Sequence, residues 1–156
     1  MPNWTINYIR LYHDDADLID RVVAAYVCDE LFREFRPLPV YLELARSEAI
    51  LRWKVENWGT KWDVGKTTYL GANSIQRRSD HEVLLVLFTA WDAPTPIFDL
   101  WVELGFEVSA SSDDQERNGQ SVVYINGASA EVFPRIEYEG NIFAQIVGEG
   151  QEMILQ

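Results

Sequence analysis

The alternation of apolar and polar positions predicts a strand at the start of the chain and helices after it. Residues 4–12, WTINYIRLY, place aromatic and β-branched side chains at alternate positions, which is typical of a strand. Apolar residues then recur at helical spacing over residues 16–35, behind aspartates that suit a helix N-terminus. We therefore predict a helix that ends before Pro37, and a second helix over residues 42–55.

The middle of the chain contains the longest apolar run. The sequence HEVLLVLFTAW at residues 81–91 is rich in β-branched and aromatic side chains and is closed by the turn sequence DAP. It predicts a central strand that is covered on both faces. Over residues 59–78 the periodicity disappears, so we expect a loop there, with a short strand near residues 67–70.

The last third of the chain predicts one helix and several strands. The Thr-Pro pair at residues 95–96 is typical of a helix start, and apolar residues at helical spacing continue to Gly105. Such an order favours an α+β fold with helices on one face of a mostly antiparallel sheet. The strands are expected at residues 106–111, 121–126, 135–138 and 142–147, the last two joined by the turn sequence EGN.

Length and cysteine content suggest one domain in a reducing compartment. The 156 residues suit a single domain over residues 1–156, with residues 37–80 inserted between the first helix and the central strand. Cys28 is the only cysteine, so an intrachain disulfide is excluded, and its helical position predicts a buried, inert thiol. We find no signal sequence and no apolar run of membrane-spanning length, and expect a cytoplasmic protein.

Charge is distributed unevenly along the chain. Residues 1–78 contain 11 basic and 11 acidic side chains, whereas residues 79–156 contain 2 and 14, which together account for all 13 basic and 25 acidic residues and a net charge of −12. The second half would repel nucleic acid and attract a basic partner. Its acidity favours either solubility alone or a surface that imitates nucleic acid or docks on a basic protein groove. The candidate binding residues are Asp113, Asp114, Glu116, Glu131, Glu137 and Glu139.

Tryptophans cluster around the sequence ENWGTKWD at residues 56–63. Trp53, Trp58 and Trp62 are three of the six tryptophans in the chain. They indicate either an anchor that holds a loop on the sheet or an aromatic pocket with a lysine as its polar group. In the second interpretation, two aspartates would form a carboxylate pair for general acid and base catalysis. The candidate pocket residues are Trp58, Lys61, Trp62, Asp63, Trp91 and Asp92.

Other chemical motifs are absent from the sequence. GTKWDVGKT resembles a phosphate-binding loop, but five residues separate its glycines where that loop needs four. His13 and His81 have no second histidine or cysteine at metal-ligand spacing. We therefore predict no cofactor, no metal and no catalytic residues.

Three motifs together are more specific than any one of them. MPNW at residues 1–4, ENWGTKWD at residues 56–63 and FTAWDAP at residues 88–94 resemble the YubB family, small proteins of conjugative plasmids and bacteriophages. The resemblance implies a ferredoxin-like domain and an origin on a mobile element, and it implies no catalytic residues. This chain departs from the family in retaining only Pro37 and Pro39 of a proline-rich segment before the second motif.

Two functions follow as expectations. The first is a non-enzymatic accessory protein of a phage or plasmid, which inhibits a host protein with a basic surface, such as a defence nuclease. It would bind neither nucleic acid nor membrane directly. The alternative is a small enzyme or ligand-binding protein that uses the tryptophan cluster with Lys61, Asp63 and Asp92. A structural homo-oligomer is a third option.

Overall fold

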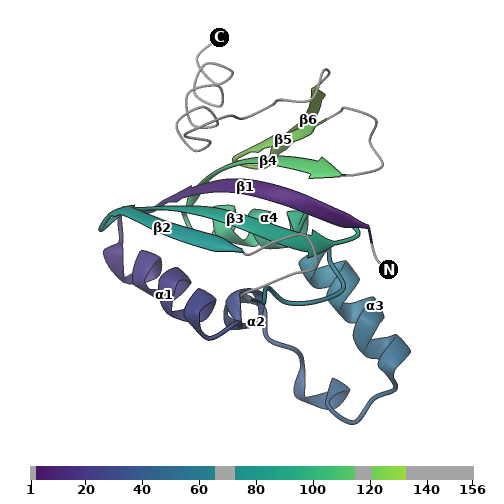
Figure 1. Cartoon of the computed structure of the whole chain (residues 1–156). Helices are drawn as coiled ribbons and strands as arrows, with labels where there is room; N and C mark the ends of the chain where they lie inside the picture. Colours follow the sequence, from purple (N-terminus) through teal and green to yellow (C-terminus); the bar gives the residue numbers. More distant parts are fainter. Residues whose placement is uncertain (1–2, 66–72, 115–120, 133–156) are drawn as a thin grey trace.

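The computed structural model describes residues 3–65, 73–114 and 121–132 of the chain. Figure 1 shows these ranges as one curved sheet with helices packed beneath it. The elements are, in chain order, β1 (Trp4–Tyr12), α1 (Ala16–Val27), α2 (Leu31–Phe35), the 3₁₀ helix η1 (Val40–Leu42), α3 (Ser47–Trp58), β2 (Ser74–Ser79), β3 (Glu82–Ala90), α4 (Thr95–Glu103), β4 (Glu107–Asp114), β5 (Ser121–Ile125) and β6 (Ala128–Val132).

The six strands form one antiparallel sheet in the order β2-β3-β1-β4-β5-β6. Strand β3 lies between β2 and β1, and β1 lies between β3 and β4, so the two strand-helix-strand units interleave. This is the ferredoxin-like arrangement of a split βαβ unit, extended at one edge by β5 and β6. The predicted α+β class with a mostly antiparallel sheet is confirmed.

The core lies between the helices and one face of the sheet. Along β1 every second residue is buried, as the alternation in the sequence predicts, and Ile9 and Leu11 are fully covered. All four α-helices contribute side chains to the same core. Its largest fully buried members are Trp58, Trp101, Phe32, Phe98, Ile9, Leu11, Ile19, Leu31, Leu84, Leu85, Leu87 and Ile97. Within the described ranges, no helix is long and apolar enough to cross a membrane.

The first predicted helix is two helices. Helix α1 ends at Val27, and Asp29 has the positive φ of 59° that turns the chain before α2 begins. Helical periodicity continues through the break because both helices bury apolar residues in the same core. Cys28 lies at this break and is exposed, so the prediction of a buried thiol is wrong.

Helix α3 covers a different range from the predicted residues 42–55. It begins at Ser47, after the 3₁₀ turn η1, and continues to Trp58 because Gly59 supplies a left-handed cap with φ 80°. A left-handed cap favours glycine, and this glycine therefore decides where the helix ends.

Two of the strands were not predicted. Strand β2 is mostly exposed, and its sequence SIQRRS contains one apolar residue, so no alternation marks it. It forms because its backbone completes the hydrogen bonding of β3 at the sheet edge. Strand β6 follows the Asn126-Gly127 turn, whose two residues have φ 45° and 103°. Such a pair is a strong hairpin signal and could have identified β6. The strands predicted at residues 67–70, 135–138 and 142–147 lie outside the described residues.

Candidate functional site

Trp58 lies in the core and does not face solvent. Its side chain is fully buried, and its indole Nε1 donates a hydrogen bond to the carbonyl of Arg36 at 2.9 Å. The ring packs against Phe32 and Trp53, with centroid distances of 6.1 and 5.7 Å. This tryptophan therefore joins α3 to α2 and is unavailable to a ligand.

The loop after Trp58 is held against the start of α4. Gly59 approaches it so closely that an added Cβ would lie 2.7 Å from Pro96 Cδ and 2.9 Å from the Ala93 carbonyl oxygen. Thr60 is also buried, and its hydroxyl donates to the Ala90 carbonyl at 2.8 Å. The sequence alone did not identify Thr60, because its partner lies thirty residues away at the end of β3.

Gly59→Ala is expected to lower the free energy of unfolding by at least about 2 kcal/mol, from left-handed strain and steric clash together. Gly127→Ala is the matched control, because Gly127 also has a positive φ but has no atom within 4 Å of an added Cβ. It should show the backbone cost alone, about 1 kcal/mol. Urea denaturation followed by circular dichroism measures both. Equal losses would show that the close approach at Gly59 contributes nothing.

Asp63 caps a helix that is distant in sequence. Its Oδ1 accepts the backbone N–H groups of Phe32 at 2.9 Å and Val64 at 2.8 Å, and its Oδ2 accepts that of Arg33 at 3.0 Å. Helix α2 has no side-chain cap from its own N-cap residue, Glu30, so Asp63 supplies one. Burial raises the pKa of Asp63, and these hydrogen bonds oppose that rise.

Asp92 is held by a different element. It is exposed in the turn before α4, and its Oδ1 accepts the backbone N–H of Ala93 at 2.8 Å. Both oxygens of Asp63 are directed at the backbone, as the bonds to α2 show. Asp63 thus caps the distant helix α2, Asp92 caps its own turn, and the geometry gives no support to a shared role in general acid and base catalysis.

Two other tryptophans surround a lysine on the surface. The Lys61 ammonium lies 4.6 Å from the Trp62 ring centroid and 5.3 Å from the Trp91 ring centroid. Both indoles remain about two-fifths exposed, at 42% and 41%. Trp4 adds a third ring, 6.0 Å from Trp62, which the sequence did not link to this cluster. Such contacts between a cation and aromatic faces are worth about 0.5–1 kcal/mol at exposed sites.

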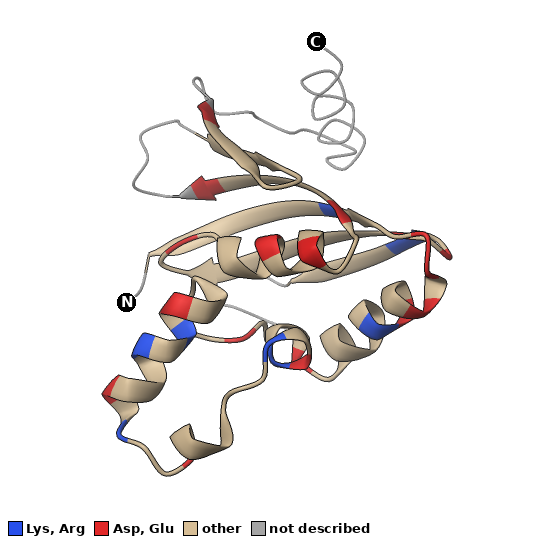
Figure 2. Ribbon diagram, turned by 180° about the vertical axis from the view of Figure 1, so that it is seen from behind, with Lys and Arg blue, Asp and Glu red and all other residues tan. Residues whose placement is uncertain are grey.

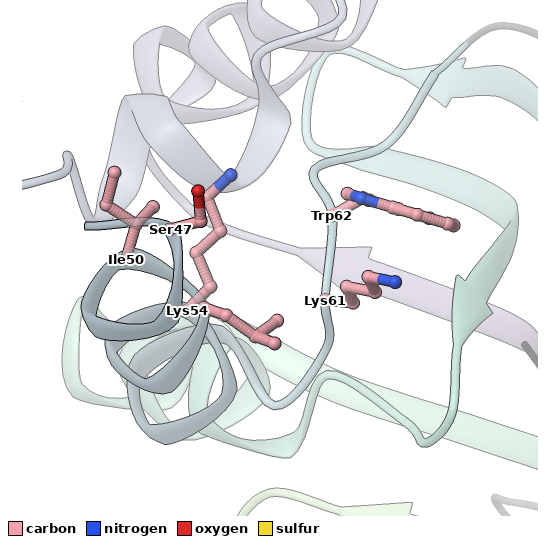
Figure 3. A pocket seen from close by; sticks show the side chains of 6 residues that line it. Ser47, Ile50, Lys54, Lys61 and Trp62 are labelled. Atoms are coloured by element: carbon pink, nitrogen blue, oxygen red, sulfur yellow. The ribbon is translucent and has the colours of Figure 1, made fainter.

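The predicted tryptophan pocket is therefore divided. Trp58 is in the core, Asp63 caps α2, and Asp92 caps the turn before α4. Lys61 and Trp62 line a cavity of about 300 Å³ beside α3, whose other walls come from residues that the sequence did not indicate. Figure 3 shows this cavity.

The predicted acidic surface is only partly described. Glu116, Glu137 and Glu139 lie outside the described residues, while Asp114 ends β4. Asp113 and Glu131 are on opposite faces of the sheet. Asp113 is paired with Ser121, and Ser121 with Val132, so these three positions share one face, and Glu131, one residue before Val132, is on the other. Glu131 is exposed, and Asp113 is half-buried and accepts a hydrogen bond from the Ser121 hydroxyl.

The histidines have structural contacts. His13 Nε2 lies 2.8 Å from the Leu104 carbonyl oxygen, and His81 Nδ1 lies 3.0 Å from the His13 carbonyl oxygen. Among the residues that the structure describes, no group of three His, Cys, Asp or Glu side chains is placed to hold a metal ion.

Comparison with protein-family models, curated proteins and solved structures found no match for this chain. The resemblance to the YubB family remains a prediction from the three motifs.

Proposed function

We propose that this chain is a protein-binding module whose acidic end docks on a basic surface of another protein. The acidic end consists of α4 and β4–β6 and carries Asp99, Glu103, Glu107, Asp113, Asp114 and Glu131. The observation that carries the proposal is the separation of charge within the folded molecule. Residues 79–114 and 121–132 contain nine acidic side chains and no lysine or arginine.

The fold turns the asymmetry along the chain into an asymmetry in space. Figure 2 shows acidic segments on α4, β4 and β6 and no basic segment on these elements. The described basic residues are on α1–α3, β1 and β2 or in the loops beside α2 and α3. Arg10 of β1 supplies cationic contacts to two late glutamates, Glu82 and Glu107. Within the described residues, α4 and β4–β6 carry no lysine or arginine, and Arg10 is the cation beside them, so their field is predominantly negative and attracts a basic partner before contact.

Several of the acidic side chains are accessible to such a partner. Asp99, Glu103, Glu107 and Glu131 are exposed. Asp99 also accepts a hydrogen bond from the Tyr124 hydroxyl at 2.6 Å, which fixes its carboxylate on α4. Burial, followed by this bond, raises the pKa of Tyr124, so the phenol stays neutral and remains a donor.

The class of partner follows from the same chemistry. A protein groove that normally binds phosphates presents clustered lysine and arginine, and a carboxylate surface can occupy it. Nucleases that defend a host against mobile elements have such grooves. Together with the three sequence motifs, this supports an inhibitor carried by a phage or plasmid.

The test compares two variants with the same change in net charge. Glu103, Glu107 and Glu131 are replaced by glutamine in one, and Glu43, Glu48 and Glu56, which are exposed in or beside α3, in the other. Partners are captured from a bacterial host and their affinities measured at about 0.05 M and about 0.3 M salt. We expect the first variant to bind at least about tenfold more weakly at low salt and the second to bind nearly as well as wild type. An affinity that is independent of salt, or equal losses in the two variants, would contradict the proposal.

A further inference from the structure

Helix α3 carries a stripe of side chains that is not packed into the core. Ser47, Ile50, Leu51 and Lys54 follow the spacing i, i+3, i+4, i+7 and so lie on one face of the helix. In this helix only Trp58 is buried, and Ile50 and Leu51 remain partly exposed. Apolar side chains on a helical face, such as Ile50 and Leu51, normally pack against another element.

A cavity of about 300 Å³ lies between this stripe and the loop that follows α3. Figure 3 shows Ser47, Ile50 and Lys54 on the helix and Lys61 and Trp62 on the loop opposite. The loop cannot easily close the gap, because Gly59, Thr60 and Asp63 hold it against α4, the end of β3 and α2. The cavity is therefore preformed, and its volume is at the lower end of the range for small-ligand pockets.

The cavity contains one cation that is suited to bind an anion. In Figure 3 the Lys61 side chain points away from α3, in accord with its contacts to the two exposed indoles. Lys54 instead lines the cavity from α3, on the same helical face as Ser47. Its ammonium lies 5.5 Å from the Trp58 ring, and among the described residues no carboxylate is within ion-pair distance of it. An ammonium beside an apolar wall is weakly screened and attracts an anion more strongly than one in open solvent.

We propose that this cavity binds a small organic carboxylate with an apolar body. The carboxylate would contact the Lys54 ammonium and the Ser47 hydroxyl, which are charged and neutral donors for the same group. The apolar body would lie against Ile50 and Leu51, with the loop as the opposite wall. The ligand would remove Ile50 and Leu51 from water, and so supply packing that these two partly exposed side chains lack in the folded chain. This site is separate from the acidic end and does not depend on it.

Fluorescence of 8-anilinonaphthalene-1-sulfonate, an aromatic anion, provides the direct test on the full chain. We expect saturable binding at one site and displacement by 3-phenylpropionate. The neutral 3-phenylpropanamide and inorganic phosphate should displace it poorly, because the amide lacks the negative charge and phosphate lacks the apolar body. Equal displacement by the amide would show a merely apolar surface, and equal displacement by phosphate would show a simple anion site. Either result would overturn the proposal.

Three variants locate the site. Lys54→Met should weaken binding of 3-phenylpropionate by about tenfold, as expected for loss of a charge-assisted contact. Arg52→Met is the matched control and should change it by less than about twofold, since Arg52 is exposed on the same helix and does not line the cavity. Leu51→Trp should abolish binding by filling the cavity. Circular dichroism and urea midpoints confirm that each variant is folded. A loss in Arg52→Met as large as that in Lys54→Met, or full affinity in Leu51→Trp, would refute this placement.

Discussion

Replacement of Trp58 by alanine is expected to lower the free energy of unfolding by about 3–5 kcal/mol. The side chain is fully buried between α2 and α3, so its removal opens a cavity that its neighbours cannot readily fill. It also leaves the Arg36 carbonyl without the indole donor. Urea denaturation followed by far-ultraviolet circular dichroism measures the loss without relying on the tryptophan signal.

Trp62→Ala is the matched control for this change. Its indole is 42% exposed and contacts Lys61 and Trp4 at the surface. We expect a loss below about 1 kcal/mol. If Trp62→Ala proved as destabilising as Trp58→Ala, the distinction between a buried anchor and an exposed aromatic surface would fail. A small loss in both would show that the tryptophan motif does not stabilise the fold.

Asp63→Ala is expected to cost about 2–3 kcal/mol, because three backbone N–H groups lose their acceptor and two of these are partly buried. Asp63→Asn should cost less, since one amide oxygen can still accept from Phe32 and Val64. Its NH₂ group would then face the N–H of Arg33, so some loss remains. Asp92→Ala, which removes one exposed cap, should cost below about 1 kcal/mol. A loss in Asp92→Ala as large as that in Asp63→Ala would contradict this assignment.

The pH dependence of stability distinguishes the cost of burying the Asp63 charge from the gain of its hydrogen bonds. Burial raises the pKa of this carboxyl in the folded protein above 3.8, so the folded state retains the proton to higher pH. The resulting contribution to stability is complete below about pH 3.8 and is lost as the pH rises through the folded pKa. Asp63→Asn cannot titrate. The stability of wild type relative to this variant should therefore be greater at about pH 4 than at about pH 7. The opposite trend would show that hydrogen bonding outweighs desolvation.

Local patterns predicted the elements whose determinants lie within a few residues. Strand β1 matches its predicted range because alternation reports a strand with one buried face. Strand β3 is within one residue of its predicted range at each end, and α4 begins at the Thr-Pro pair that marks a helix start. The antiparallel α+β class followed from these elements together.

Elements that depend on distant partners were not predicted correctly. The edge strand β2 depends on the backbone of β3 and carries little apolar signal of its own. The separation of α1 from α2 depends on a turn at Asp29 and on a cap from Asp63, about thirty residues further along the chain. Neither interaction leaves a periodic pattern in the sequence.

The sequence by itself determined the class of fold, the tryptophan motif and the position of the negative charge along the chain, because composition and periodicity are local properties. Only the tertiary structure decided what the motif does. Trp58 and Trp62 are four residues apart, yet one is in the core and the other at the surface, because Gly59 ends the helix between them. Likewise, Lys54 became a candidate ligand contact only when the loop was placed opposite α3, since a cavity depends on elements that meet in space.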